Sequence, residues 1–321
     1  MLNIHKRLPL ALALVAGLAG AQLPAEAATY SYRQPAVGLV APAVATPPVP
    51  APASCSLPWG GSLASGGSVS AYPLATVAAP GSCVAEMLTC ANGVLSNPTA
   101  VQSCTVTDPD WAGVSAQLEF DGDVVDARGA TVTKVGVATP ATSSSVFKVG
   151  TGALDLSTGG YVTLPAASLN FGTQDFTVEF WYQRKTDNGS YQHLLMNQAG
   201  DGSSFIINFG NSGFGNKLMV YTGSNASPLT IAEVTKATVG TAWHHYAVTR
   251  YQGTLNVYLD GFRVAQRANQ TANLTHTSPW VIGSASGYNA LGYFDSVRIT
   301  KGVARYTGAS FTPNTMPFAV Q

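Results

Sequence analysis

The sequence predicts an all-β protein whose larger part is an antiparallel jelly-roll sandwich of two sheets. Apolar and polar residues alternate over short stretches, as in 176–182, where Phe176, Val178 and Phe180 fall on one face. Turn residues separate these stretches, since the chain contains 33 Gly and 19 Pro. Helical periodicity is almost absent, and roughly ten or more short strands over about 210 residues fit two stacked sheets.

The composition narrows the class of protein. The 321 residues include 16 Lys+Arg and 16 Asp+Glu, so the net charge is zero. A nucleic-acid binder needs a basic excess to neutralise phosphates, which excludes that class. Only 10% of residues are charged while 46% are hydrophobic. This composition provides enough apolar material for a core and excludes a charge-rich disordered chain.

The first 27 residues have the pattern of a secretory signal peptide. Lys6 and Arg7 precede an apolar stretch, and Ala25 and Ala27 supply the small residues of a cleavage site. The apolar stretch is too short to span about 30 Å of hydrocarbon. The sequence therefore predicts a secreted, extracellular or cell-surface protein with no membrane insertion after signal removal.

Residues 28–53 are expected to form a Pro/Ala-rich spacer, because closely spaced Pro residues remove backbone donors and favour extended geometry. A small module at 54–106 follows and contains all four cysteines of the chain, Cys55, Cys83, Cys90 and Cys104. An even number in an exported segment predicts two disulfides, with three pairings open. A zinc site is disfavoured because close Cys-x-x-Cys pairs and His are missing from this segment.

The large domain is expected at 108–318 and reads as a series of strands. Two hairpin turns are predicted, at Gln252-Gly253 and at Asp260-Gly261, on either side of the alternating stretch 255–259. Further strands are expected at 114–121, 161–164, 204–209, 217–222, 243–250, 262–266, 279–283 and 292–300.

Several motifs in this domain carry a family resemblance. They are DPDWAGVSAQLEFDGD at 108–123, QDFTVEFWY at 174–182, WHHYAVTR at 243–250, LNVYLDGFRVA at 255–265 and the closing stretch at 292–318. In this order they resemble bacterial and phage laminin-G-like domains of the concanavalin A-like lectin/glucanase superfamily. The resemblance implies a jelly roll, a fold that hosts lectins, glycosidases, adhesins and spacer domains. SCSLPWGG at 54–61 and LTCANGVLS at 88–96 resemble a four-cysteine module of bacterial surface and secreted proteins.

An enzyme of this superfamily is expected to carry three acidic residues at alternate positions of one strand. Glu119, Asp121 and Asp123 have that spacing. However, Gly122 breaks a strand, and in the related domains this stretch ends the first strand in a turn. We therefore predict a protein that is not an enzyme and keep glycan cleavage as an alternative.

The resemblance also implies Ca²⁺, held by carboxylates and carbonyls at a sheet edge. The candidate ligands are Asp121, Asp123 and Asp126 in the FDGDVVDARG loop, with Asp295 as a distal partner. The alternative is that these Asp residues stabilise turns through their own backbone. His244 and His245 are neighbours in a predicted strand and point to opposite faces, so they are not expected to share an ion.

Sugar recognition needs an aromatic ring against the apolar face of a pyranose, flanked by amides that bond its hydroxyls. Tyr191, Tyr288 and Asn289, in two polar loops, are the predicted ligand-binding residues. The leading functional hypothesis is a non-catalytic adhesion protein that presents the lectin-like domain to glycans or glycoproteins. The second hypothesis is a structural subunit or decoration of an extracellular fibre, in which the partner is another copy of the chain.

Overall fold

A computed structural model describes residues 47–137, 139–141, 146–166, 170–197, 204–223, 227–283 and 287–321. Residues Pro52–Gln321 form one compact unit. The predicted signal peptide at 1–27 and the spacer up to residue 46 lie outside the described residues. Within the described part, no helix has the length and hydrophobicity that crossing a bilayer requires.

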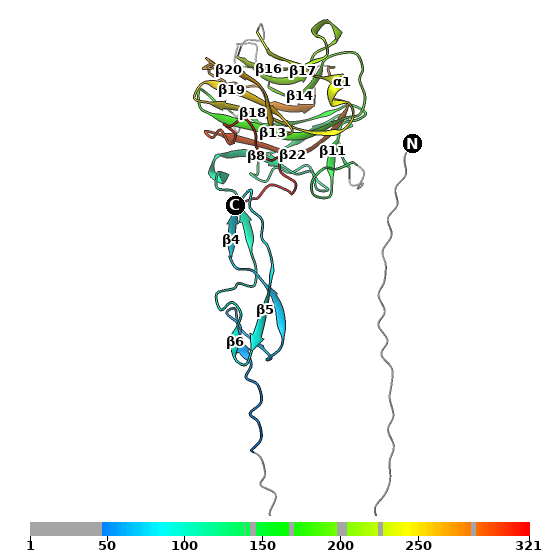
Figure 1. Ribbon diagram of the computed structural model, residues 1–321. Helices are drawn as coiled ribbons and strands as arrows, with labels where there is room; N and C mark the ends of the chain where they lie inside the picture. The colour runs from blue at the N-terminus through cyan, green and yellow to red at the C-terminus, as the bar shows by residue number, and fades with distance from the viewer. Residues whose placement is uncertain are drawn as a thin grey trace, which may run out of the picture. The chain divides into compact units, whose positions relative to one another are not determined.

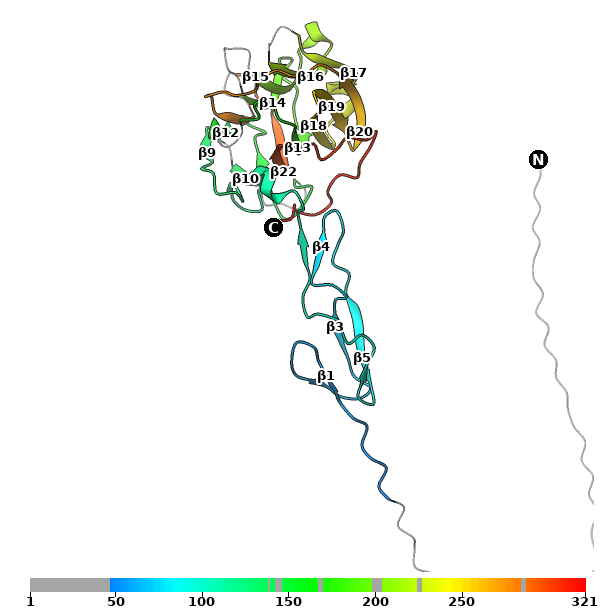
Figure 2. The ribbon, with the colours of Figure 1, turned by 90° about the vertical axis from the view of Figure 1, so that its left-hand side faces the viewer.

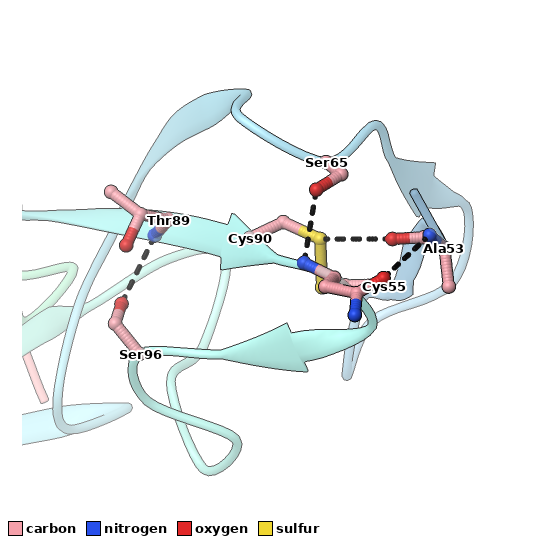
Figure 3. The surroundings of a disulfide bond; sticks show 7 residues. Ala53, Cys55, Ser65, Thr89, Cys90 and Ser96 are labelled. Atoms are coloured by element: carbon pink, nitrogen blue, oxygen red, sulfur yellow. Dashed lines mark hydrogen bonds between the residues drawn. A yellow bond between two sulfur atoms is a disulfide. The ribbon is translucent and has the colours of Figure 1, made fainter. Parts of the chain in front are cut away.

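The four cysteines form two disulfides, as predicted. The pairs are Cys55–Cys90 and Cys83–Cys104, which selects one of the three pairings that the sequence left open. Figure 3 shows the first disulfide beside the β5–β6 turn, where Thr89 N–H donates to Ser96 Oγ (3.0 Å). The hydrophobic core of this segment is small. It consists of Ala71, Leu88 and Ala100, with Trp59 packed against them. The disulfides therefore contribute a large share of this segment's stability.

Seven short strands build this segment in three small sheets. β1 pairs with β2, β3 pairs with β5, which pairs with β6, and β4 pairs in parallel with β7. The bounds are β1 Cys55–Ser56, β2 Ser62–Leu63, β3 Ser68–Ala71, β4 Thr76–Ala78, β5 Glu86–Ala91, β6 Val94–Leu95 and β7 Thr105–Thr107.

The rest of the chain is the predicted jelly roll of two antiparallel sheets, which Figures 1 and 2 show as two stacked layers. The first sheet has the order β10-β11-β22-β13-β18-β19-β20, with β8 paired to β22. Its strands are β8 Val114–Leu118, β10 Thr139–Ala141, β11 Ala153–Asp155, β13 Phe176–Arg184, β18 Trp243–Tyr251, β19 Thr254–Leu259, β20 Phe262–Arg267 and β22 Gly292–Lys301.

The second sheet has the order β17-β16-β15-β14-β21-β12-β9. Its strands are β9 Thr133–Val135, β12 Tyr161–Leu164, β14 Gln192–Asn197, β15 Ser204–Phe209, β16 Lys217–Gly223, β17 Leu229–Thr235 and β21 Trp280–Gly283. One short helix, α1 (Lys236–Val239), follows β17. The all-β prediction is confirmed, and most of the predicted strands agree within one or two residues.

The core lies between the two sheets. Phe176, Val178 and Phe180 of β13 are fully buried in it, on the face that the alternation predicted. The predicted hairpin turns are also present: Gln252 and Gly253 have φ values of 49° and 73° and connect β18 to β19. Left-handed backbone at both turn residues matches the twist of the flanking strands.

The outer face of the first sheet is covered by the end of the chain, residues 302–321. Tyr306 OH donates to Glu179 of β13 (2.7 Å), and Trp181 Nε1 donates to Asn314 Oδ1 (2.9 Å). Phe318 N–H donates to Glu119 (3.2 Å) just beyond β8. The alternation predicted this face as the polar one, whereas the covering segment buries it.

The outer face of the second sheet carries a different surface. Met196, Ile206 and Val281 form a small apolar cluster on it, and Tyr161 and Tyr221 pack against that cluster. These three side chains are 2%, 5% and 7% exposed, so the cluster is a second, smaller core on this side of the sheet.

Candidate functional site

Four rings lie close together at the N-terminal end of β14, on the outer face of the second sheet. The ring centroid of Tyr191 lies 5.7 Å from that of Phe214 and 5.4 Å from that of Tyr288. His193 contacts both tyrosines, with its ring centroid 5.1 Å from Tyr288 and 6.3 Å from Tyr191. Phe214 is 48% exposed and Tyr288 is 38% exposed, so two of the four rings are accessible to a ligand. We call these residues, Tyr191, His193, Phe214 and Tyr288, the aromatic cluster.

Local backbone geometry brings three of the rings to this place. His193 lies on β14, and its N–H donates to the carbonyl of Tyr288 (2.9 Å), which fixes the second loop against the first. Phe214 ends a short 3-10 turn, Ser212–Phe214, in which its N–H donates to the Asn211 carbonyl (3.0 Å). The turn closes at Gly215 with a φ of 65°, a left-handed conformation that suits glycine.

The loop at 185–191, which carries the fourth ring, is held by a buried lysine. Lys236 is 2% exposed, and its Nζ lies 2.9 Å from Asp187 Oδ1. The same Nζ donates to the Ser190 carbonyl, next to Tyr191. This contact fixes both ends of the turn before Tyr191 and thereby sets the position of its ring.

Polar groups accompany the rings. Asn208 pairs with His193 across β14 and β15, and its buried Oδ1 has no hydrogen-bond partner among the described residues. Asn211 Oδ1, in the turn that carries Phe214, is also buried and also has no hydrogen-bond partner among the described residues. Burial lowers the pKa of His193 to about 4, so the imidazole is neutral near pH 7. The cluster is thus a neutral aromatic surface, and the neighbouring amide oxygens are buried.

The structure brings together two of the three predicted ligand-binding residues. Tyr191 and Tyr288 come from loops almost one hundred residues apart and meet in the aromatic cluster. Asn289 lies elsewhere, because its side chain is directed at Gly159, where an added Cβ would be 3.5 Å from Asn289 Nδ2. The sequence did not reveal His193 and Asn208 as members, since β14 was not among the predicted strands. His193 and Asn208 are brought together by the pairing of β14 with β15, which the sequence alone does not indicate.

Of the predicted calcium ligands, Asp126 has a clear structural task. Its Oδ1 accepts the N–H groups of Gln117 (2.7 Å) and Arg128 (3.2 Å), and its Oδ2 accepts that of Ala130 (2.9 Å). The carboxylate therefore stabilises the turn and joins it to β8. This arrangement matches the alternative that the sequence analysis kept for these residues.

Asp121 and Asp295 form a different arrangement. Asp295 Oδ2 accepts the N–H groups of Lys148 (2.7 Å) and Val149 (2.8 Å), while its buried Oδ1 has no partner in the described part of the chain. Burial, together with a smaller contribution from the Asp121 carboxylate, raises the pKa of Asp295 to about 7. An unpartnered buried carboxylate oxygen beside a second carboxylate suits a hard cation. No group of three or more His, Cys, Asp or Glu side chains with metal-binding geometry occurs among the described residues.

The acidic triplet considered for glycan cleavage does not lie on one strand. β8 ends at Leu118, and Phe120 has a φ of 61°, so strand alternation stops before Asp121. Glu119 Oε2 accepts from Ser296 Oγ (2.6 Å), and its Oε1 accepts from Phe318 N–H. This carboxyl group is thus engaged beneath the end of the chain, which separates it from any groove.

A second acid–base group is buried under the same segment. Glu179 is fully buried, accepts from Arg298 Nε (2.9 Å), and has His245 Nε2 at 3.5 Å. Burial raises the pKa of Glu179, but the Arg298 guanidinium and the contact with His245 outweigh that effect and hold this pKa far below its usual range. The His244–His245 pair behaves as predicted: His245 points into this network, while His244 points away and contacts Asp260 (2.7 Å). The network is inaccessible to substrate and serves the fold.

The two antiparallel sheets form a β-sandwich with the aromatic cluster at one outer face. Residues 156–305 match the family model described as the concanavalin A-like lectin/glucanases superfamily. The match includes the motifs at 174–182, 243–250 and 255–265, and over this stretch it confirms their resemblance to the superfamily. A search of curated proteins finds no match.

Solved structures with a similar fold include two binding domains and one domain of an arabinanase. The binding domain of Paraclostridial Mosquitocidal Protein 1 is 14% identical with a TM-score of 0.49, over 61% of this chain and 50% of that one. Domain 4 of the arabinanase AbnA from Geobacillus stearothermophilus, solved with arabinotriose, is 18% identical with a TM-score of 0.45, over 59% and 92%. The botulinum neurotoxin serotype D binding domain is 14% identical with a TM-score of 0.44, over 60% and 49%. The chain spans about half the length of the two toxin domains.

Proposed function

We propose that the protein is a non-catalytic binding protein, secreted or displayed on the cell surface, that recognises glycans or glycoproteins through the aromatic cluster. The observation that carries the proposal is the convergence of Tyr191, His193, Phe214 and Tyr288 on an outer sheet face, with two rings accessible. A pyranose ring has an apolar face that stacks on such rings.

The electrostatics of the cluster also favour a neutral sugar. His193 carries no charge near pH 7, because burial lowers its pKa to about 4. Burial and the neighbouring Tyr288 raise the pKa of Tyr191, which keeps its hydroxyl neutral as well.

The proposed location outside the cytoplasm rests on the signal-like start of the chain and on the two disulfides. Disulfides persist in oxidising compartments and are rare in the cytosol. We further propose that Ca²⁺ binds at Asp121 and Asp295 and acts structurally. Asp295 Oδ1 is the buried oxygen that would coordinate such an ion.

The test is a glycan array with the mature full-length chain, followed by titration calorimetry with the best neutral oligosaccharide. Tyr288→Ala should weaken binding about tenfold, which corresponds to about 1.4 kcal/mol for one stacked ring. Phe214→Ala should have a similar effect, because it removes the other accessible ring.

Tyr251→Ala is the matched control. Tyr251 is 41% exposed, close to the exposure of Tyr288, but it lies at the β18–β19 turn in the other sheet. Its loss should leave the affinity unchanged. The absence of binding to any glycan on the array would contradict the proposed site. An equal loss of affinity in the Tyr251 and Tyr288 variants would contradict it as well. Light scattering of the same samples tests the fibre hypothesis, which requires self-association that increases with protein concentration.

A further inference from the structure

A hollow that is distinct from the aromatic cluster lies where β13 ends. Gln183, Arg184, Lys185, Thr241 and Tyr293 line it. The strand register places these residues together, because Gln183 pairs with Tyr293 on one side and with Trp243 on the other. The lining combines a ring, an amide, a hydroxyl and two cations, a set of groups that binds sugars and anions.

Arg184 is the unusual member of this lining. The residue is only 9% exposed, and its Nε has no hydrogen-bond partner among the described residues. Its NH2 group donates to the Lys236 carbonyl, and its NH1 group lies 3.6 Å from Asp187, beyond hydrogen-bond distance. The guanidinium is therefore buried with incomplete compensation, a condition that attracts an anion.

The surrounding charges leave a positive balance. Lys236 holds Asp187 through a 2.9 Å contact, so the nearest carboxylate is shared between two cations. Lys185 adds a third cation: its Nζ lies 5.8 Å from the Tyr293 ring centroid and 3.3 Å from Ser157 Oγ. Asp155 pairs with Tyr293 across β11 and β22 and is the second carboxylate of this region. Three cations against two carboxylates give a net charge of +1.

We infer that this hollow is a second binding site that takes the anionic group of an acidic sugar, a carboxylate or a sulfate, against Lys185 and Arg184. The Tyr293 ring supplies the surface on which the sugar stacks, and Gln183 and Thr241 supply groups for its hydroxyls. The inference goes beyond the neutral aromatic cluster, since none of its lining residues belongs to that cluster.

Two matched pairs of sugars test the site by calorimetry with the full chain. Digalacturonic acid is compared with its dimethyl ester, and galactose 6-sulfate with galactose, so that each pair differs only in the charged group. At low salt the charged member should bind about fivefold more tightly, and 0.5 M NaCl should remove the difference, because salt screens surface charges. A preference within only one pair supports the site and identifies which anion it accepts.

The exposed Lys185 offers a variant that should fold normally. Lys185→Gln should abolish the preference for the charged sugar, whereas Lys134→Gln, which removes an exposed lysine from β9, should retain it. Equal binding of charged and neutral sugars by the wild type would overturn the inference, and so would a preference that survives in Lys185→Gln. Tyr288→Ala separates the two proposals, because it should weaken neutral oligosaccharides without changing the ratio between charged and uncharged sugars.

Discussion

His193 gives the sharpest test of the buried geometry at the aromatic cluster, through the replacement His193→Phe. Burial lowers its folded-state pKa to about 4 from an ordinary value of 6.5. Between these values the unfolded chain binds more protons than the folded one, so His193 makes the free energy of unfolding rise with pH. The contribution is complete above pH 6.5 and is lost as the pH falls towards 4. At about 1.4 kcal/mol per pKa unit it amounts to about 3 kcal/mol.

The assay is urea unfolding of wild type and His193→Phe at several pH values between 4.5 and 8, followed by tryptophan fluorescence. Phe retains an aromatic ring in the cluster but cannot titrate. The difference between the two proteins isolates His193 from Glu119, whose buried carboxyl has a pKa raised to about 7 and so acts in the opposite direction. The free energy of unfolding of the wild type minus that of His193→Phe should fall by about 2.5 kcal/mol between pH 8 and pH 4.5, for the reason just given.

His244→Gln is the control with the opposite sign. The hydrogen bond to Asp260 raises the pKa of His244, so its contribution is present below pH 6.5 and is lost as the pH rises. Parallel stability curves for wild type and His193→Phe across this pH range would refute the argument, because they would mean that His193 is hydrated in the folded protein.

Three further predictions concern the remaining parts of the structure. Glu179→Gln should destabilise the sandwich by about 1–3 kcal/mol in thermal or urea unfolding, because the buried Arg298 guanidinium loses one of its two carboxylates and keeps only Asp108 (3.1 Å). Reduction of the disulfides should make the cysteine-containing segment sensitive to limited proteolysis while the sandwich, which has no cysteine, stays resistant; the 35-residue separation of Cys55 and Cys90 corresponds to about 4 kcal/mol. Ca²⁺ at about 100 times its dissociation constant should stabilise the protein by about 2.7 kcal/mol, measured as a rise in melting temperature, and Asp295→Asn should abolish the rise.

The parts of the fold that were predicted from sequence are those with local signals. In β13, apolar and polar residues alternate from Phe176 to Phe180. The two-residue turns at Gln252-Gly253 and Asp260-Gly261 need left-handed backbone, which the glycine in each turn adopts readily. β14 has no such alternation. Its pairing with β15 shifts register between His193 and Leu195, so that Leu194 and Leu195 both reach the core. A bulge of this kind removes the period-two pattern on which the prediction depends.

The candidate site was predicted only in part for a related reason. Tyr191 and Tyr288 have local signals, since each is an amphipathic ring in a polar loop, but their contact depends on the pairing of β14 with its neighbours. The burial of Glu179 was not visible either, because Tyr306, which covers it, lies more than one hundred residues away. Long-range contacts decide which of several similar loops meet and which polar face is buried.

Lys236 connects these long-range contacts to binding, because it holds the loop that carries Tyr191. Lys236→Met keeps the apolar stem of the side chain but removes the donor to Asp187 and to the Ser190 carbonyl. We expect the neutral-glycan affinity to fall as far as it does in Tyr191→Ala, although no ligand contact is removed directly. The double variant Lys236→Met/Tyr191→Ala should be no weaker than either single variant, because the two changes disable the same ring. If the two losses in binding free energy simply add, Lys236 acts on overall stability and does not position Tyr191.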